Sequence, residues 1–287
     1  MSTNETRIAH DGSDSDEAMT KEEICGEEPP TKPKMRNAFS ELMSRKPKTP
    51  ATPPPAKISR GGNPFKDRMG LGAYLEDPAS YPSSRVISYS DNFVLINDRY
   101  PKAAIHTLLL PRSADHNLMH PFDAFDDPEF LASVKAETAK LKVLVAKELR
   151  RRLSHASQGD AARQAVLNGD AEPLADGELP PGRDWNGDII CGVHAVPSMR
   201  HLHVHVLSRD MHSETLRHRK HYNSFTTPFL VDVDDFPLSL DDPRRNTKEA
   251  GYMRWDMKCW RCGRNFGNQF QKLKAHLDDE YEQWRRQ

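Results

Sequence analysis

The stretch His201-Leu-His-Val-His-Val-Leu-Ser208 carries the strongest information about the fold of this sequence. Its side chains alternate between imidazole rings and aliphatic groups. Residues two apart in a β-strand point to the same face, because successive side chains alternate across the strand. A strand here would therefore present His201, His203 and His205 on one face and bury the aliphatic side chains between them.

Three histidines on one strand face have three interpretations. They could ligate a metal ion, because sites of three histidines are common in metalloproteins. They could form a nucleophilic site, in which one imidazole attacks phosphorus while its neighbours orient it and bind the phosphate. They could also be the exposed polar face of an edge strand. The alternation alone leaves all three open.

The residues just before this strand favour the phosphate site. Gly192-Val-His194-Ala-Val-Pro197-Ser198 adds a fourth histidine and a hydroxyl group. Hydroxyl and amide donors beside a histidine suit an anionic phosphoryl group, whose oxygens need hydrogen-bond donors. Neutral imidazole is available near pH 7, because its unperturbed pKa is ~6.5. Cys191 is better explained as a buried thiol than as a nucleophile.

The upstream sequence predicts the rest of the fold. Apolar runs at residues 93–96 and 105–110 flank a turn-rich segment and predict two paired strands. Asp127-Pro128 then begins a long helix, with proline at its first position. One face of this helix is apolar: Leu131, Val134, Leu141, Val145 and Leu149. We therefore predict an α+β fold, an antiparallel sheet with one long helix packed on it.

Composition divides the chain into three parts. Residues 1–62 are polar and rich in acidic residues, proline and lysine, so we expect a disordered tail that offers sites for protein partners. We place the main domain at residues 63–230. Residues 154–185 lose the helical period and gain Gly, Asp and Pro, which predicts a surface insertion. A linker and a small module occupy residues 231–287.

Bulk properties exclude several classes of protein. The formal net charge is -1, so the chain as a whole is not basic. A nucleic-acid partner could therefore be bound only by local basic patches. The chain has 4 cysteines, too few for a disulfide framework, which favours a reducing compartment. We expect no membrane association, because the sequence has neither an apolar run of ~20 residues nor a signal peptide.

The C-terminal module has the spacing of a zinc finger. Cys259-x₂-Cys262 is followed by His276 and Glu280, which share a helix face because they are four residues apart. We expect a ββα-like finger in which these four residues bind a structural Zn²⁺. Asp279 is a less favoured fourth ligand. The alternative is an inert or redox-active CxxC pair.

Two basic clusters suit contact with nucleic acid. Arg261, Arg264 and Lys272 surround the finger ligands, and a second run ends at Lys220-His221. Basic groups interleaved with aromatic rings suit phosphate contact and base stacking. Generic fingers also bind proteins, and basic runs are often only solvated, so the residues alone leave DNA binding open.

Four blocks of sequence together resemble the aprataxin family of the histidine-triad superfamily, in its fungal type. They are the triad strand, the preceding block from Gly192, the segment Lys220-His-Tyr-Asn-Ser-Phe225, and Asp98-Arg-Tyr-Pro-Lys-Ala103 with His106. The resemblance spans residues 64–284. Glutamate in the last ligand position of the finger also occurs in fungal members of this family. We expect no forkhead-associated domain of the kind found in some relatives, because residues 1–62 are too polar and too short for one.

The resemblance implies a role for each catalytic residue. His203 would be the nucleophile that takes up AMP as an adenylyl-histidine. His194 would give a proton to the leaving group and then activate water. His201 and His205 would position His203 and contact the phosphate, and Ser198 would donate a hydrogen bond to it.

The resemblance also implies contacts with the substrate. Lys102 would pair with the phosphate charge, and His106 would belong to the same wall of the site. Asp98 would hold the ribose hydroxyls, Leu71 would help to form the adenine pocket, and Phe65 would stack on the DNA end. DNA contacts would come from two groups: Lys220, His221, Asn223 and Ser224 in the main domain, and Arg261, Arg264 and Lys272 in the finger.

The implied function is hydrolysis of 5′-adenylated DNA ends, the products of abortive ligation, to AMP and a 5′-phosphate. Substrates would include nicks, double-strand ends and RNA–DNA junctions, and the protein would act in the nucleus. The chemical step would need no metal. Two alternatives are a general dinucleoside-polyphosphate hydrolase, and a zinc-finger adaptor that binds nucleic acid without catalysis.

Overall fold

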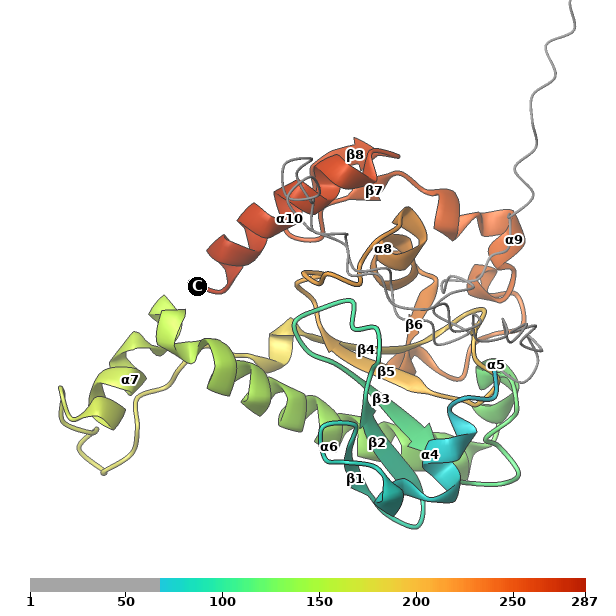
Figure 1. Cartoon of the computed structure of the whole chain (residues 1–287), viewed down its shortest axis with the longest axis horizontal. Coiled ribbons are helices and arrows are strands. Elements are labelled where there is room, and N and C mark those ends of the chain that lie inside the picture. Colours follow the sequence, from blue (N-terminus) through green and yellow to red (C-terminus); the bar gives the residue numbers. More distant parts are fainter. Residues whose placement is uncertain (1–67) are drawn as a thin grey trace, which may run out of the picture.

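The computed structural model describes residues 68–287 and is built around one antiparallel sheet (Figure 1). Its 6 strands have the order β1-β2-β3-β5-β4-β6. The strands are β1 (Val86–Tyr89), β2 (Phe93–Asn97), β3 (His106–Pro111), β4 (Ile189–His194), β5 (Val204–Ser208) and β6 (Leu230–Asp232). The predicted pair of strands upstream is β2 and β3, and the fold class is confirmed. The tail predicted at residues 1–62 lies outside the described residues.

One long helix, α6 (Pro128–Leu153), covers one face of the sheet. It begins where the sequence predicts, because Asp127 Oδ1 accepts hydrogen bonds from the backbone N–H groups of Glu129 and Phe130, at 2.9 and 3.1 Å. The apolar face of α6 packs against the side chains of β4 and β5 that point toward it, and together they form the largest core of the protein.

The opposite face of the sheet carries the histidines. In the β3–β5 pair, His106 lies opposite Leu207 and Leu108 lies opposite His205, and directly paired residues share a face. Near β2 this face is covered by α4 (Gly72–Glu76), whose Leu75 packs with neighbouring strand residues. Near β4 it is covered by α8 (Arg219–Thr226) and by the finger beyond it (Figure 1).

The triad strand is shorter than predicted. β5 begins at Val204, so His201 and His203 lie in the extended segment that leads into it. The backbone of this segment pairs with loops instead, because Leu202 N donates to Asn117 O at 2.8 Å. The alternation of faces survives, since Leu202 is 1% exposed and belongs to the core beneath α6.

The segment predicted as a surface insertion holds more structure than a loop. It contains the 3₁₀ turns η2 (Ser154–Ala156) and η3 (Gln158–Asp160) and the helix α7 (Ala161–Asn168), which has no buried residue. Its two ends are nevertheless buried, since Asp160 is 0% and Trp185 is 2% exposed. These ends therefore belong to the folded body of the protein.

The finger is a small unit with a core of its own. It consists of β7 (Met257–Lys258), β8 (Asn265–Gly267) and α10 (Phe270–Trp284), the predicted ββα arrangement. Its core continues into Tyr222 and Phe225 of α8, so the finger packs against the main domain. The remaining helical elements are η1 (Pro78–Ser80), α5 (Pro121–Ala124), η4 (Asn186–Asp188), η5 (Val233–Asp235), η6 (Pro243–Arg245), α9 (Thr247–Ala250) and η7 (Tyr252–Arg254). Within residues 68–287, none of the helices has the length and apolar character needed to cross a membrane.

Candidate active site and zinc site

A cavity of about 30 Å³ lies on the histidine face of the sheet, between β3, β4, β5 and α8. It collects side chains from segments far apart in the sequence. The lining residues are Asp98, Tyr100, Lys102, His106, His194, Ser198, His203, His205, Ser224 and Phe225. The structure thus brings together most of the catalytic and substrate-binding residues that the sequence predicts.

His203 has the orientation of a nucleophile. Its Nδ1 lies 2.7 Å from the carbonyl oxygen of His201. A carbonyl can only accept, so Nδ1 carries the hydrogen and the lone pair is on Nε2. Burial lowers the pKa of His203, and the His201 carbonyl and Asp98 oppose that shift. The side chain is therefore neutral near pH 7.

A chain of hydrogen bonds sets the tautomers of two further histidines. The backbone N–H of Lys102 donates to His106 Nδ1 at 3.1 Å. The hydrogen of neutral His106 is then on Nε2, which donates to His205 Nδ1 at 2.9 Å. Neutral His205 consequently carries its hydrogen on Nε2. We call this chain the tautomer relay.

The relay is buried, and this keeps its histidines neutral. Burial lowers the pKa of His106 to about 4, against the opposing effect of Asp98, whose Oδ2 lies 3.4 Å from His106 Nε2. Burial also lowers the pKa of His205 well below its ordinary value. His205 Nε2 has no hydrogen-bond partner among the described residues, so it is a donor available to a ligand in the cavity.

His194 lies across the cavity at the end of β4. Its ring centroid is 4.3 Å from that of His205 and 4.8 Å from that of Phe225. Burial lowers the pKa of His194 well below its ordinary value, and its Nε2 lacks a hydrogen-bond partner in residues 68–287. An anionic phosphoryl group in the cavity would raise that pKa, because opposite charge favours the protonated form.

Lys102, Asp98 and Ser198 complete the polar wall of the cavity. Lys102 is 5% exposed, and its Nζ donates to the carbonyl oxygen of Tyr100 at 2.8 Å. Asp98 Oδ1 accepts from the backbone N–H of Tyr100 at 2.7 Å, which closes the loop between β2 and β3. Tyr100 was not singled out from the sequence, although it lies in a segment that carries the family resemblance.

His201 and Leu71 lie outside the cavity lining. The ring of His201 packs against α4, where a Cβ on Gly72 would lie 2.7 Å from His201 Cε1. Its backbone carbonyl nevertheless orients His203. Leu71 is buried with Leu75 in the cluster beneath α4. Phe65, the predicted stacking residue, falls outside the described residues.

The structure distinguishes between the three interpretations of the alternating histidines. The three rings are buried, so they are not an exposed polar face. Within residues 68–287, one group of side chains near the cavity is close enough together to hold a metal ion. It consists of Asp98, His106 and His205, and not of the three triad histidines. Hydrogen bonding already accounts for the closeness of His106 and His205. The geometry favours the nucleophilic site.

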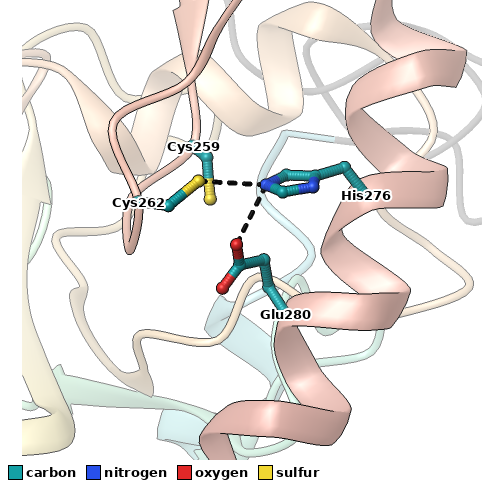
Figure 2. Close-up of side chains that lie close together, drawn as sticks. All are labelled: Cys259, Cys262, His276 and Glu280. Atoms are coloured by element: carbon teal, nitrogen blue, oxygen red, sulfur yellow. Dashed lines mark hydrogen bonds and ion pairs between the residues drawn. The ribbon is translucent and has the colours of Figure 1, made fainter.

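A second cluster lies in the finger, as predicted (Figure 2). Ligand atoms of Cys259, Cys262, His276 and Glu280 all lie within 4.8 Å of one another. His276 Nε2 is 3.1 Å from Cys262 Sγ and 3.1 Å from Glu280 Oε1. Two thiols, one imidazole and one carboxylate converging on a point fit tetrahedral Zn²⁺, which favours nitrogen and sulfur ligands.

Arg261 supports this cluster from outside. Its Nη1 donates to Glu280 Oε2 at 2.6 Å, so the carboxylate is oriented toward the other ligands. Burial acts to raise the pKa of Glu280, and hydrogen bonding to Arg261 and Cys262 outweighs it, so the pKa is lowered. Arg261, predicted as a DNA contact, thus pairs with the Glu280 carboxylate.

The other predicted DNA contacts fall into two classes. Arg264 and Lys272 are exposed on the finger, and Lys220 is half-buried. His221, Asn223 and Ser224 are buried in α8. The Asn223 amide donates to the carbonyl of Trp255 at 2.8 Å, which ties α8 to the segment before the finger. Ser224 lines the cavity instead of the surface.

Comparison with known proteins agrees with this two-part architecture. Residues 81–212 match the family described as HIT domain, and residues 226–283 match the C2HE / C2H2 / C2HC zinc-binding finger. The chain is 34% identical over 253 residues to the aprataxin-like protein of Schizosaccharomyces pombe, covering 88% of this chain and 95% of that protein. It is 32% identical over 219 residues to the aprataxin-like protein of Saccharomyces cerevisiae, covering 75% of this chain and 95% of that protein.

Solved structures show the same relationship. The crystal structure of the aprataxin ortholog Hnt3 in complex with DNA has a TM-score of 0.57 at 32% identity, covering 76% of this chain and 96% of that chain. Hnt3 in complex with DNA and guanosine has a TM-score of 0.58 at 33% identity, with the same coverage of both chains. The chain therefore belongs to the aprataxin-like proteins, with a histidine-triad domain followed by a zinc-binding finger.

Proposed function

We propose that this protein is a DNA-repair hydrolase that removes AMP from 5′-adenylated DNA ends and leaves a 5′-phosphate. The observation that carries the proposal is the cavity, which is lined by His203, by a second histidine, His194, and by the buried Lys102. The relatives named as Hnt3 bind DNA, and we extend that binding to this chain.

The reaction would proceed in two displacements. His203 Nε2 attacks the phosphorus of AMP, so an N–P bond forms and the P–O bond to the DNA 5′-phosphate breaks. His194, protonated once the anionic substrate is bound, gives its proton to the departing phosphate oxygen. Water then attacks the phosphorus of the adenylyl-histidine and gives a proton to His194; the N–P bond breaks, its electron pair returns to His203 Nε2, and AMP leaves. The His201 carbonyl supports the positive charge that develops on the His203 ring.

The remaining cavity residues would hold the phosphoryl group. His205 Nε2 offers a hydrogen through the tautomer relay, and Ser198 offers its hydroxyl group. Lys102 supplies positive charge, which stabilises the additional charge on the phosphoryl oxygens in the transition state. Asp98 would hold the ribose, and Leu71 the adenine. The chemical step in this scheme uses groups of the chain itself and one water molecule.

The finger would hold the DNA. We propose that Zn²⁺ bound by Cys259, Cys262, His276 and Glu280 has a structural role and that exposed Arg264 and Lys272 contact phosphates. Action on nicks, double-strand ends and RNA–DNA junctions, residence in the nucleus, and partner binding by residues 1–62 are parts of the same proposal. So are the domain limits at residues 63–230 and 231–287.

The test compares AMP release from an adenylated nicked duplex with cleavage of diadenosine polyphosphate. We expect His203→Ala to lower kcat for the adenylated duplex by at least about 10³-fold, because the nucleophile is lost. His155→Ala, a change at an exposed histidine, is the matched control. Mass spectrometry of enzyme quenched in denaturant at alkaline pH, where the P–N bond survives, should find AMP attached to wild type and not to the variant.

The outcomes separate the three functions. Turnover of diadenosine polyphosphate as efficient as that of adenylated DNA would favour the general nucleotide hydrolase over the repair enzyme. DNA binding without release of AMP would favour the adaptor. Undiminished activity of His203→Ala would show that another group is the nucleophile.

A further inference from the structure

The two buried ends of the 154–185 segment hold the end of the finger helix. Figure 1 shows the C-terminal end of α10 approaching the far end of α6 and the segment that carries α7. The backbone N–H of Gln158 donates to Arg286 O at 2.9 Å, and that of Gly159 donates to Gln287 O at 2.6 Å. The insertion is therefore bonded directly to the finger module.

Arg183 is the centre of this contact. Its guanidinium lies 4.1 Å from the ring centroid of Trp185 and 5.0 Å from that of Trp284, the last residue of α10. Its Nη2 lies 2.7 Å from Asp188 Oδ2, and its Nη1 donates to the carbonyl oxygen of Trp284 at 2.6 Å. The Arg183 side chain is 10% exposed, so these interactions are little screened by solvent.

Both tryptophans are anchored through their indole N–H groups. Trp284 Nε1 donates to Asp188 Oδ1 at 2.9 Å, and Trp185 Nε1 donates to Asp160 Oδ2 at 2.8 Å. The two rings are 1% and 2% exposed and meet edge to face, with centroids 6.3 Å apart. We call Asp160, Arg183, Trp185, Asp188 and Trp284 the clamp.

A glycine allows the two ends of the insertion to lie against each other. A Cβ on Gly182 would lie 2.0 Å from Asp160 Oδ1, a distance that no side chain tolerates. Glycine therefore lets the chain before Arg183 pass directly over the buried carboxylate of Asp160. The chain approaches most closely at the Asp160 carboxylate, the group that anchors Trp185. We therefore interpret the clamp as a specific contact.

The clamp acts on the helix that carries two finger ligands. His276 and Glu280 precede Trp284 on α10 by eight and four residues, or roughly 12 and 6 Å along the axis. Nearer the start of α10, Lys274 Nζ donates to the carbonyl oxygens of Ser213 and Leu216, at 3.2 and 2.8 Å. The helix is thus tied to the histidine-triad domain at two points.

We propose that the clamp is a specificity device: it positions the finger so that a DNA end held by the finger enters the cavity of His203. This inference rests on the proposed function. The clamp lies outside the cavity, and none of its residues lines it. It therefore contributes to reaction with adenylated DNA and leaves reaction with a free dinucleotide unchanged.

The experiment measures kcat and KM of Arg183→Ala for two substrates, an adenylated nicked duplex and diadenosine tetraphosphate. We expect KM for the duplex to rise about 10-fold, because the finger loses its fixed orientation. We expect kcat/KM for the dinucleotide to stay within about 2-fold. Arg151→Ala is the matched control, because it removes the same charge from an exposed site that pairs only with Glu148 in the described contacts.

Hydrogen exchange supplies the second readout. Amides of the last turns of α10 should exchange faster in Arg183→Ala, while amides of β3 and β5 keep their protection. If Arg183→Ala does not fold, Asp188→Asn is the milder variant, since it removes one charge from the clamp and keeps the shape of the side chain.

Each result has a distinct meaning. Equal losses on both substrates would show that the clamp only stabilises the fold, and unchanged kinetics on both would remove its role in positioning. Either result overturns the inference while wild type still releases AMP from DNA. A wild type that does not act on adenylated DNA would instead overturn the proposed function.

Discussion

The protein uses histidine in two opposite ways, in the cavity and in the finger. The cavity histidines are buried among one another, and this burial lowers their pKa values, so the rings stay neutral. His276 of the finger lies beside two cysteines and a carboxylate, a set suited to hold a cation. The partners of a histidine thus decide its chemistry: imidazole and carbonyl partners suit proton and phosphoryl transfer, while thiol and carboxylate partners together suit metal binding.

The largest expected effect tests whether the two sites are separable. Cys259→Ala should unfold the finger, because structural zinc contributes ~10–16 kcal/mol to folding of finger peptides. We expect kcat/KM for adenylated DNA to fall by roughly 10³-fold through lost DNA contacts, and that for diadenosine tetraphosphate to change by less than about 3-fold. Zinc content and kinetics check this, with Cys191→Ala as the control thiol. Equal losses on both substrates would mean that the finger also supports the cavity.

The next effect tests the tautomer relay. His106→Ala removes the group that sets the hydrogen of His205, so kcat should fall by about 10²-fold with little change in KM for DNA. The pH dependence of kcat should change as well, because His205 can then take either tautomer. Thr107→Val is the control, since it removes a buried hydrogen bond to Val206 on the opposite face of the same strand. A control as slow as His106→Ala would argue for a purely structural effect.

A smaller effect is the pH dependence that His106 of the cavity gives to the free energy of unfolding. The folded-state pKa of His106 is lowered to about 4, so below pH ~6.5 the unfolded state binds the proton more readily. Its contribution to the free energy of unfolding is therefore complete above pH ~6.5 and declines as the pH falls toward 4. Between pH 7 and pH 5 wild type should lose about 2 kcal/mol more than His106→Phe.

Urea unfolding of the two proteins at each pH measures this difference. Release of zinc from the finger at acid pH affects both proteins equally and cancels in the comparison. Parallel stability curves for wild type and His106→Phe would show that His106 is not held neutral by the fold.

The smallest effect concerns the surface of the finger. Arg264→Ala should raise KM for adenylated DNA about 3-fold and lower the salt dependence of binding by about one unit, as expected for one phosphate contact. Titration of DNA binding at several salt concentrations checks this. Lys248→Ala, at an exposed lysine of α9, should leave both quantities unchanged.

The sequence predicted the parts of the site that depend on local pattern. Strict alternation around His203 and His205 fixes which face they share, and Asp127-Pro128 marks the start of α6 through capping. The spacing of the finger ligands follows from a knuckle and one turn of helix. These features need no knowledge of distant contacts.

Features that depend on contacts between distant parts of the chain could not be predicted from the sequence. Asn223, predicted to touch DNA, is buried with its amide on Trp255, and only the packing of α8 against the finger reveals this. The late start of β5, at Val204, depends on which backbone lies beside Leu202. Arg183 and Trp284 meet across 101 residues of chain, and no local pattern marks that pair.

The register between β3 and β5 has a consequence for folding. His106 and His205 are 99 residues apart in the chain, and they meet only when Leu108 lies opposite His205. A slip of one residue by either strand would turn the histidine of that strand to the face of α6 and bring its neighbour, Thr107 or Val206, to the cavity face, so the two histidines would lie on opposite faces. Recovery of activity after refolding therefore reports correct pairing of the two strands, which a spectroscopic measure of sheet content would miss.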